Sequence, residues 1–312
     1  MAGGRVGAEG PRNTADCPSF EAQIKQGFIM RLAITIAGAL ALSVAAPAAA
    51  QDTAPDGGQE KSALDGDYLA VGVGAGYLPS YEGSNDYKVS PVPLVQGRLE
   101  GIDIDPRGGG IALDFIPDRP GKVGFNLGVA GKVRLNRTGK TNDPVVDRLG
   151  KLAMAVELGP TVGITVPHLL DPYDSFSITV DALWDVAGAH KGMVIDPLVS
   201  YTTPLSRGIL ANLSASAEYG DDKFAAYNYS VTPAGAIASG LPAFAANGGF
   251  NKVGGRLLLG FDLDGDLTDG GAALFVLSGY NRMLGDAKRT PITSLRGSAN
   301  QLMGVVGIGY TF

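Results

Sequence analysis

Apolar and polar residues alternate along most of this chain in segments of ten residues or more. In the last segment Leu302, Val306, Ile308, Tyr310 and Phe312 share one face, and several of the residues between them are small or polar. A period of two residues is that of a β-strand with one apolar face. In outer-membrane barrels the terminal strand closes the sheet and its last aromatic residue lies in the interfacial girdle. We therefore interpret this segment as the closing strand of a membrane barrel.

Longer segments with the same alternation support this interpretation. Residues 122–134, 152–166 and 174–187 each place apolar side chains on one face and polar side chains on the other. A soluble β-sandwich also alternates, but its outward face would be the charged one and its strands are usually shorter. Segments of this length fit strands that are tilted across a membrane with ends projecting beyond it.

Long polar links alternate with short turns, which indicates the direction of each strand. The long links are residues 135–151, 220–249 and 285–299, and the short ones are 167–173, 204–207 and 264–269. Bacterial barrels have long outer loops, short periplasmic turns and an even number of strands. The sequence predicts an all-β fold, a transmembrane antiparallel up-and-down β-barrel of twelve strands. A ten-strand barrel is the alternative if Leu99-Glu100-Gly101 is a bend within one strand. The expected strands are residues 68–77, 87–95, 97–105, 109–116, 122–134, 152–166, 174–187, 191–203, 208–219, 250–263, 270–284 and 300–312.

The amino-terminal region predicts export. A basic start at Met30-Arg31 precedes an apolar run of about a dozen residues and an Ala-x-Ala site at residues 48–50, which is the pattern of a secretory signal peptide. We expect cleavage between Ala50 and Gln51. A disordered extension ahead of a membrane anchor is the alternative. The expected parts are a non-native or misassigned extension at 1–29, the signal peptide at 30–50, a polar periplasmic lead-in at 51–67 and a single barrel domain at 68–312.

Charge and cysteine content exclude several classes of function. Residues 1–50 hold four of the 25 basic and three of the 31 acidic residues, which leaves 21 against 28 and a net charge of −7. No basic patch predicts nucleic-acid binding. The single cysteine, Cys17, lies in the part expected to be removed, so we predict no disulfide and no thiolate metal site.

Two motifs resemble ligand sites only in part. The run Gly72–Gly76 lacks the third glycine and the following helix of a dinucleotide fingerprint, so we expect room inside the barrel or a close backbone approach instead. Asp262–Asp266 with Asp269 is similar to a calcium loop. An EF-hand has glycine at its sixth position and glutamate at its twelfth, whereas here Gly265 is fourth and Ala273 is twelfth. A solvated periplasmic turn is the expected role, with weak divalent binding left open. We predict no cofactor and no defined metal site.

His168 and His190 are the two histidines of the chain, and both fall in or beside connections. We expect them at the surface, since two isolated histidines without cysteine make a poor transition-metal site. No Gly-x-Ser-x-Gly motif is present, and a catalytic triad would need one of these histidines. The sequence therefore predicts no catalytic residues and no enzyme activity.

Charged residues on the polar faces are predicted to point into the barrel. They are Lys132, Arg134, Glu157, Asp181, Asp185, Asp196, Glu218, Lys252, Arg256 and Asp262. Charges of both signs in a narrow barrel either pair across the lumen and fill it, which we favour, or line a small water path. In the second case Asp181, Asp185 and Asp196, on neighbouring strands, would give a preference for cations.

Loop motifs add a family resemblance. In order along the chain they are Tyr81-Glu82-Gly83-Ser84, Pro91-Val92-Pro93, Tyr229-Ser230-Val231-Thr232-Pro233, Ser239-Gly240-Leu241-Pro242, Gly285-Asp286-Ala287 and Pro291-Ile292. With these motifs the mature chain resembles the MltA-interacting protein (MipA)/OmpV family of outer-membrane proteins. The resemblance implies a non-enzymatic barrel in the outer membrane of a Gram-negative bacterium. Its implied partners are membrane lipid, a murein lytic transglycosylase and a murein synthase.

Two functions follow as hypotheses. The first is a scaffold that links murein hydrolase and murein synthase in peptidoglycan remodelling, as the resemblance implies. The second is a narrow channel or small-solute porin, which the charged lumen and the long loop at 220–249 would support if the loop folds inward as a constriction.

Overall fold

The computed structural model describes residues 66–117 and 121–312. The expected extension at 1–29, the signal peptide at 30–50 and the lead-in up to residue 65 lie outside the described residues. Within the described ranges, no helix has both the length and the apolar character needed to cross a membrane.

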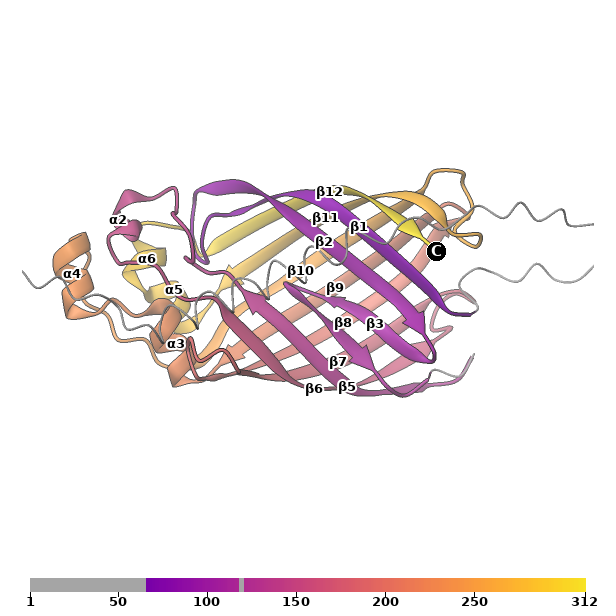
Figure 1. Cartoon of the computed structure of the whole chain (residues 1–312), viewed down its shortest axis with the longest axis horizontal. Helices are drawn as coiled ribbons and strands as arrows, with labels where there is room; N and C mark the ends of the chain where they lie inside the picture. The colour runs from indigo at the N-terminus through magenta and orange to yellow at the C-terminus, as the bar shows by residue number, and fades with distance from the viewer. Residues whose placement is uncertain (1–65, 118–120) are drawn as a thin grey trace, which may run out of the picture. The chain divides into compact units, whose positions relative to one another are not determined.

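Twelve antiparallel strands form a closed barrel in which each strand pairs with its neighbours in sequence and β1 pairs with β12 (Figure 1). The strands are β1 Tyr68–Pro79, β2 Tyr87–Leu99, β3 Ile102–Arg107, β4 Gly110–Asp114, β5 Gly124–Arg134, β6 Ala155–Pro167, β7 Ser175–Asp185, β8 Met193–Ser206, β9 Ile209–Gly220, β10 Gly249–Asp262, β11 Gly271–Met283 and β12 Asn300–Thr311. The predicted twelve strands are therefore confirmed, and the ten-strand alternative is wrong.

The predicted position of the turn between the second and third strands is wrong. The expected strands at 87–95 and 97–105 placed a turn near residue 96, whereas β2 continues to Leu99 and the chain turns at Glu100 and Gly101. Both turn residues have positive φ, 52° and 79°. Two central turn residues with positive φ match the twist of a tight hairpin. Leu99-Glu100-Gly101 is thus the end of β2 and its turn.

The apolar faces predicted from alternation lie on the outside of the barrel. Leu302, Val306 and Ile308 of β12 are 60–63% exposed, while Val305 between them is buried. Trp184 of β7 and Leu213 of β9 are also exposed. A continuous outer surface of exposed apolar side chains fits contact with lipid.

The glycines of β1 leave space for an aromatic side chain that points into the barrel. A Cβ added at Gly72 or Gly74 would lie 3.1 Å from the ring of Phe275, and one added at Gly307 would lie 2.4 Å from it. Phe275 itself is buried inside the barrel. The glycine run therefore provides close packing, as expected, and it lies within a strand and not at the start of a helix.

The wall is weakest between β2 and β3. These strands pair only over Gly97–Leu99, although β2 is thirteen residues long. The Ser80 N–H donates to the Asp86 carbonyl at 2.8 Å, so even-numbered residues of this segment face β1 and odd-numbered residues face the other edge. The backbone groups of Pro91 and Pro93 therefore point away from β1, toward the edge at which no described strand pairs with these two residues. Proline is suited to such an edge because it has no N–H to leave unpaired.

In the part of the chain that the structure describes, five short helices lie in the loops at one end of the barrel (Figure 1). They are α2 Pro144–Asp147, α3 Asp222–Tyr229, α4 Pro233–Ser239, α5 Gly285–Arg289 and α6 Pro291–Ser294. Buried apolar residues gather beneath them, among them Phe224, Tyr229, Met283 and Ala287. The long loops thus form a packed cap at this end.

Candidate functional site: a closed lumen

Arg134, at the loop end of β5, is the centre of a charge cluster in the lumen. Its Nε atom lies 2.9 Å from Glu157 Oε1, its Nη1 lies 2.9 Å from Glu82 Oε1, and its Nη2 lies 2.9 Å from Glu218 Oε2. These carboxylates come from β6, the β1–β2 loop and β9. One guanidinium therefore ties together three separate parts of the barrel.

Two lysines complete this lumen cluster. Lys252 Nζ lies 2.9 Å from Glu82 Oε1 and 3.1 Å from Glu218 Oε2. Lys132 pairs with Asp196 and lies 4.0 Å from Glu218. The predicted pairing of charges across the lumen is confirmed for these residues. A buried charge is costly unless it is paired, so the lumen cluster depends on every member.

The α3 helix closes the lumen cluster from the loop side. The side chains of Phe224 and Tyr229 are fully buried, and Arg134 Cζ lies 4.7 Å from the centre of the Phe224 ring. The Tyr229 hydroxyl donates to Glu82 Oε2 at 2.7 Å. The loop at 220–249 therefore does fold inward, as its length suggested, and residues 222–229 act as a plug.

The electrostatics of the plug favour a charged Glu82 beside a neutral Tyr229. Burial raises the pKa of Glu82, but the positive charges of Lys252 and Arg134 outweigh it and leave the pKa below its usual value of 4.5. Burial and the adjacent Glu82 carboxylate raise the pKa of the Tyr229 hydroxyl well above 10.0. The hydroxyl thus remains a donor to a charged acceptor, which is a strong type of hydrogen bond.

His190 is buried, so its expected surface position is wrong, whereas His168 is exposed. His190 Nδ1 accepts a hydrogen bond from the Gly192 N–H at 3.0 Å. Its Nε2 therefore carries the proton and donates to Glu157 Oε1, also at 3.0 Å. The histidine holds a carboxylate of the lumen cluster in place.

The predicted acidic group on β7 and β8 does not act as one cluster. Asp181 and Asp196 are register partners, but Asp181 pairs with Arg107 at 3.0 Å and Asp196 pairs with Lys132. Asp185 instead accepts backbone N–H groups of the following turn. No set of unpaired carboxylates among the described residues supports the expected cation preference.

Arg256 differs from the other predicted lumen cations. The described residues include no carboxylate within ion-pair distance of it. An added Cβ at Gly108 would lie 3.3 Å from Arg256 Nη1, so the side chain reaches across to the β3–β4 turn. Arg107 and Glu82 are the charges that sequence reasoning missed. Arg107 fell outside the predicted strand because the preceding turn was misplaced, and Glu82 lies in a loop, where alternation gives no signal.

The aspartates of the β10–β11 turn lie close together. Carboxylate oxygens of Asp262, Asp264 and Asp269 are within 4.8 Å of one another. Asp262 accepts N–H groups of Asp264, Gly265 and Asp266, which explains its position as a turn residue. This agrees with the expected role as a turn and does not identify a bound ion.

The contacts within the lumen cluster are of a structural kind. Each of its carboxylates is held by a cation, and none is left as a free acid or base. Residues from five strands and two loops meet there, so the arrangement spans the lumen and joins the strands at the loop end of the wall. Its geometry fits closure of the barrel.

The model of the family described as MltA-interacting protein MipA matches residues 71–312, and the chain belongs to this family. Among curated proteins no relative was found. Solved structures similar to the chain include an outer membrane channel from Pseudomonas putida F1, with 12% identity, 84% of this chain and 100% of that chain covered, and a TM-score of 0.41. The CymD monoaromatic hydrocarbon channel is similar at 11% identity, with 79% and 88% covered and a TM-score of 0.34. The chain is an outer-membrane barrel protein.

Proposed function

We propose that this barrel is a non-enzymatic scaffold in a Gram-negative outer membrane. It would hold a murein-cleaving lytic transglycosylase, and with it a murein synthase, at its periplasmic face during peptidoglycan remodelling. The family description names an interaction with MltA, which supports the first partner. The residues of the lumen cluster support the absence of catalysis, because their carboxylates are all engaged by cations.

The observation that carries this proposal is the closed lumen. Arg134 binds three carboxylates, and Phe224 and Tyr229 of the plug lie directly against this group. A general porin needs an aqueous path, whereas charged and aromatic side chains meet across the lumen here. A closed barrel is suited to presenting a surface and not to passing solutes.

A rigid apolar turn at the other end of the barrel provides a candidate docking surface. Asp174 is buried and accepts the N–H groups of Leu169 and Leu170 at 2.6 and 2.8 Å, and the hydroxyl of Tyr201 at 2.7 Å. This holds the turn while Leu170 and Tyr173 are each 81% exposed. Large exposed apolar side chains on a fixed backbone are typical of protein contact sites.

Binding of a purified MltA-type lytic transglycosylase to the detergent-solubilised barrel tests the proposal. Biolayer interferometry should show saturable binding that weakens by about tenfold or more in the Leu170→Asp/Tyr173→Asp variant, as expected when an anchor residue is lost. Leu295→Asp is the matched control, since Leu295 is 61% exposed at the loop end. Absence of binding by the unmodified protein, or an equal loss in the control, would contradict the proposal.

A narrow channel is the second candidate, and the β2–β3 seam favours it. The edge of β2 that faces β3 is unpaired at Pro91 and Pro93, because β3 pairs with it only over Gly97–Leu99, so the wall is interrupted beside the lumen. Unpaired backbone groups are costly in hydrocarbon, which favours water or solute at this edge. Discrete conductance steps from the unmodified protein in planar bilayers would support the channel, and a silent bilayer would support the scaffold.

A further inference from the structure

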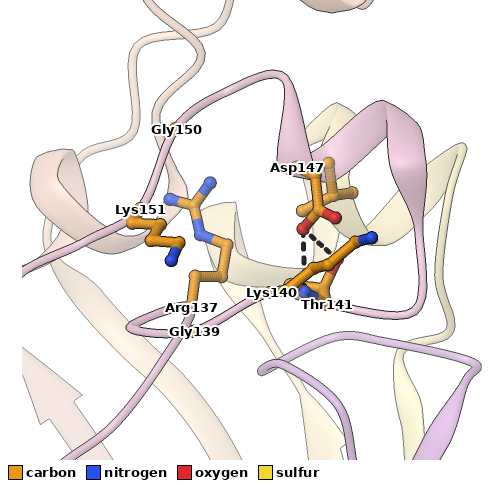
Figure 2. A pocket seen from close by; sticks show the side chains of 8 residues that line it. Arg137, Gly139, Lys140, Thr141, Asp147, Gly150 and Lys151 are labelled. Carbon is orange, nitrogen blue, oxygen red and sulfur yellow. Dashed lines mark hydrogen bonds between the residues drawn. The ribbon is translucent and has the colours of Figure 1, made fainter.

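A small cavity lies in the loop between β5 and β6, outside the lumen cluster. It has a volume of about 270 Å³ and is lined by residues 137–151, among them Arg137, Lys140, Asp147 and Lys151 (Figure 2). This volume is near the lower end for ligand sites, so it suits a small chemical group and not a large molecule. Long loops of such barrels face the outside of the cell.

Arg137 is the unusual residue of this cavity. The residue is only 5% exposed, yet its Nε atom has no hydrogen-bond partner among the described residues. Its Nη2 donates to the Asn228 carbonyl at 3.3 Å, a neutral acceptor at the end of the plug. No described carboxylate lies within ion-pair distance of the guanidinium. Burial without a nearby anion lowers the pKa of the guanidinium from its usual value.

The cavity as a whole is positive. Three cations, Arg137, Lys140 and Lys151, face one carboxylate, Asp147. In Figure 2 Arg137 and Lys151 lie beside each other, while Lys140 lies near Asp147. The Asp147 carboxylate also accepts both the N–H and the hydroxyl of Thr141 at 2.8 Å. Arg137 and Lys151 are thus left as a pair of cations without a described counter-ion.

We propose that this cavity binds the phosphate group of an anionic ligand, held by Arg137 and Lys151. A phosphate oxygen would satisfy the buried Nε and compensate the guanidinium, and Arg with Lys is a common pair for such groups. Lipopolysaccharide headgroups and free phosphate share this chemistry. The site is separate from the periplasmic turn of the proposed scaffold, so either proposal can fail without the other.

Isothermal titration of the detergent-solubilised protein at low salt tests the site with two probes, inorganic phosphate and vesicles containing lipopolysaccharide. Saturable binding of either probe is expected, and Lys151→Gln should weaken it by about tenfold, as for loss of one charge-assisted hydrogen bond. Binding of phosphate alone would identify a free anion as the ligand. Binding of the vesicles without free phosphate would identify the lipid headgroup.

Lys151 and Lys288 are both exposed loop-end lysines, so Lys288→Gln is the matched control and should bind as the unmodified protein does. Arg137→Gln should abolish binding, and Arg137→Lys should restore part of it. If the Arg137 variants do not fold, the affinity of Lys151→Gln, compared with that of Lys288→Gln, is sufficient to test the proposal. Binding of neither probe by the unmodified protein, or equal affinities for Lys151→Gln and Lys288→Gln, would overturn the proposal.

Discussion

The cost of a charged side chain in this barrel depends on which side of the wall it faces. Leu257 on β10 is exposed on the outside and is register partner to the exposed Leu213. The next residue, Leu258, faces inward and is register partner to Asn212. Neighbouring residues of one strand thus meet lipid and lumen respectively.

Leu257→Arg should therefore destabilise the barrel more than Leu258→Arg. A charge against hydrocarbon costs about 2–4 kcal/mol near the midplane. In the lumen the cost should come mainly from sterics and repulsion by Arg256. Folding into lipid vesicles, followed by urea titration, measures both variants. Equal penalties or the reverse order would show that the register of β10 is wrong.

The strands could be predicted from the sequence, whereas the plug could not. Strands were predictable because lipid outside and polar groups inside impose a period of two on each of them. The plug carried no such period, since Phe224 and Tyr229 reach the lumen from a short helix in a loop. The partners of Arg134 could not be predicted from the sequence either. They come from β6, β9 and a loop, and only closure of the barrel brings them together.

The plug should be sensitive to acid through Glu82. The pKa of this carboxyl is lower in the folded protein than its usual 4.5, so it contributes stability above that pH and loses the contribution as the pH falls through the folded value. Plug closure should be unchanged between about pH 7 and 5 and should weaken as the pH falls below the usual carboxyl value of 4.5. Planar-bilayer recordings at each pH detect opening as new conductance.

Glu82→Gln is the control for this effect, because it removes the charge that pairs with Arg134 and Lys252 at any pH. We expect it to conduct at neutral pH and to lose most of the acid response. A barrel that stays silent in acid, together with a silent Glu82→Gln variant, would show that Glu82 does not hold the plug.

The whole molecule depends on the contact between its first and last strands. The Phe312 N–H donates to the Leu69 carbonyl at 3.0 Å, and the Leu69 N–H donates to the Phe312 carbonyl at 3.3 Å. Register pairs continue from Ala70 with Thr311 to Tyr77 with Gly304. Without this seam two strand edges would be exposed to hydrocarbon, where each unpaired group costs several kcal/mol.

Loss of residues 310–312 should therefore impair assembly of the entire barrel. The deletion removes the pairing at the end of the seam away from the long loops, and Phe312→Asp places a charge where an exposed aromatic side chain now lies. Both changes should lower the fraction of heat-modifiable folded protein on a gel of outer membranes. Phe312→Tyr keeps an aromatic ring and should assemble normally. Normal assembly of the deletion variant would show that the remaining β1–β12 pairs are sufficient to close the barrel.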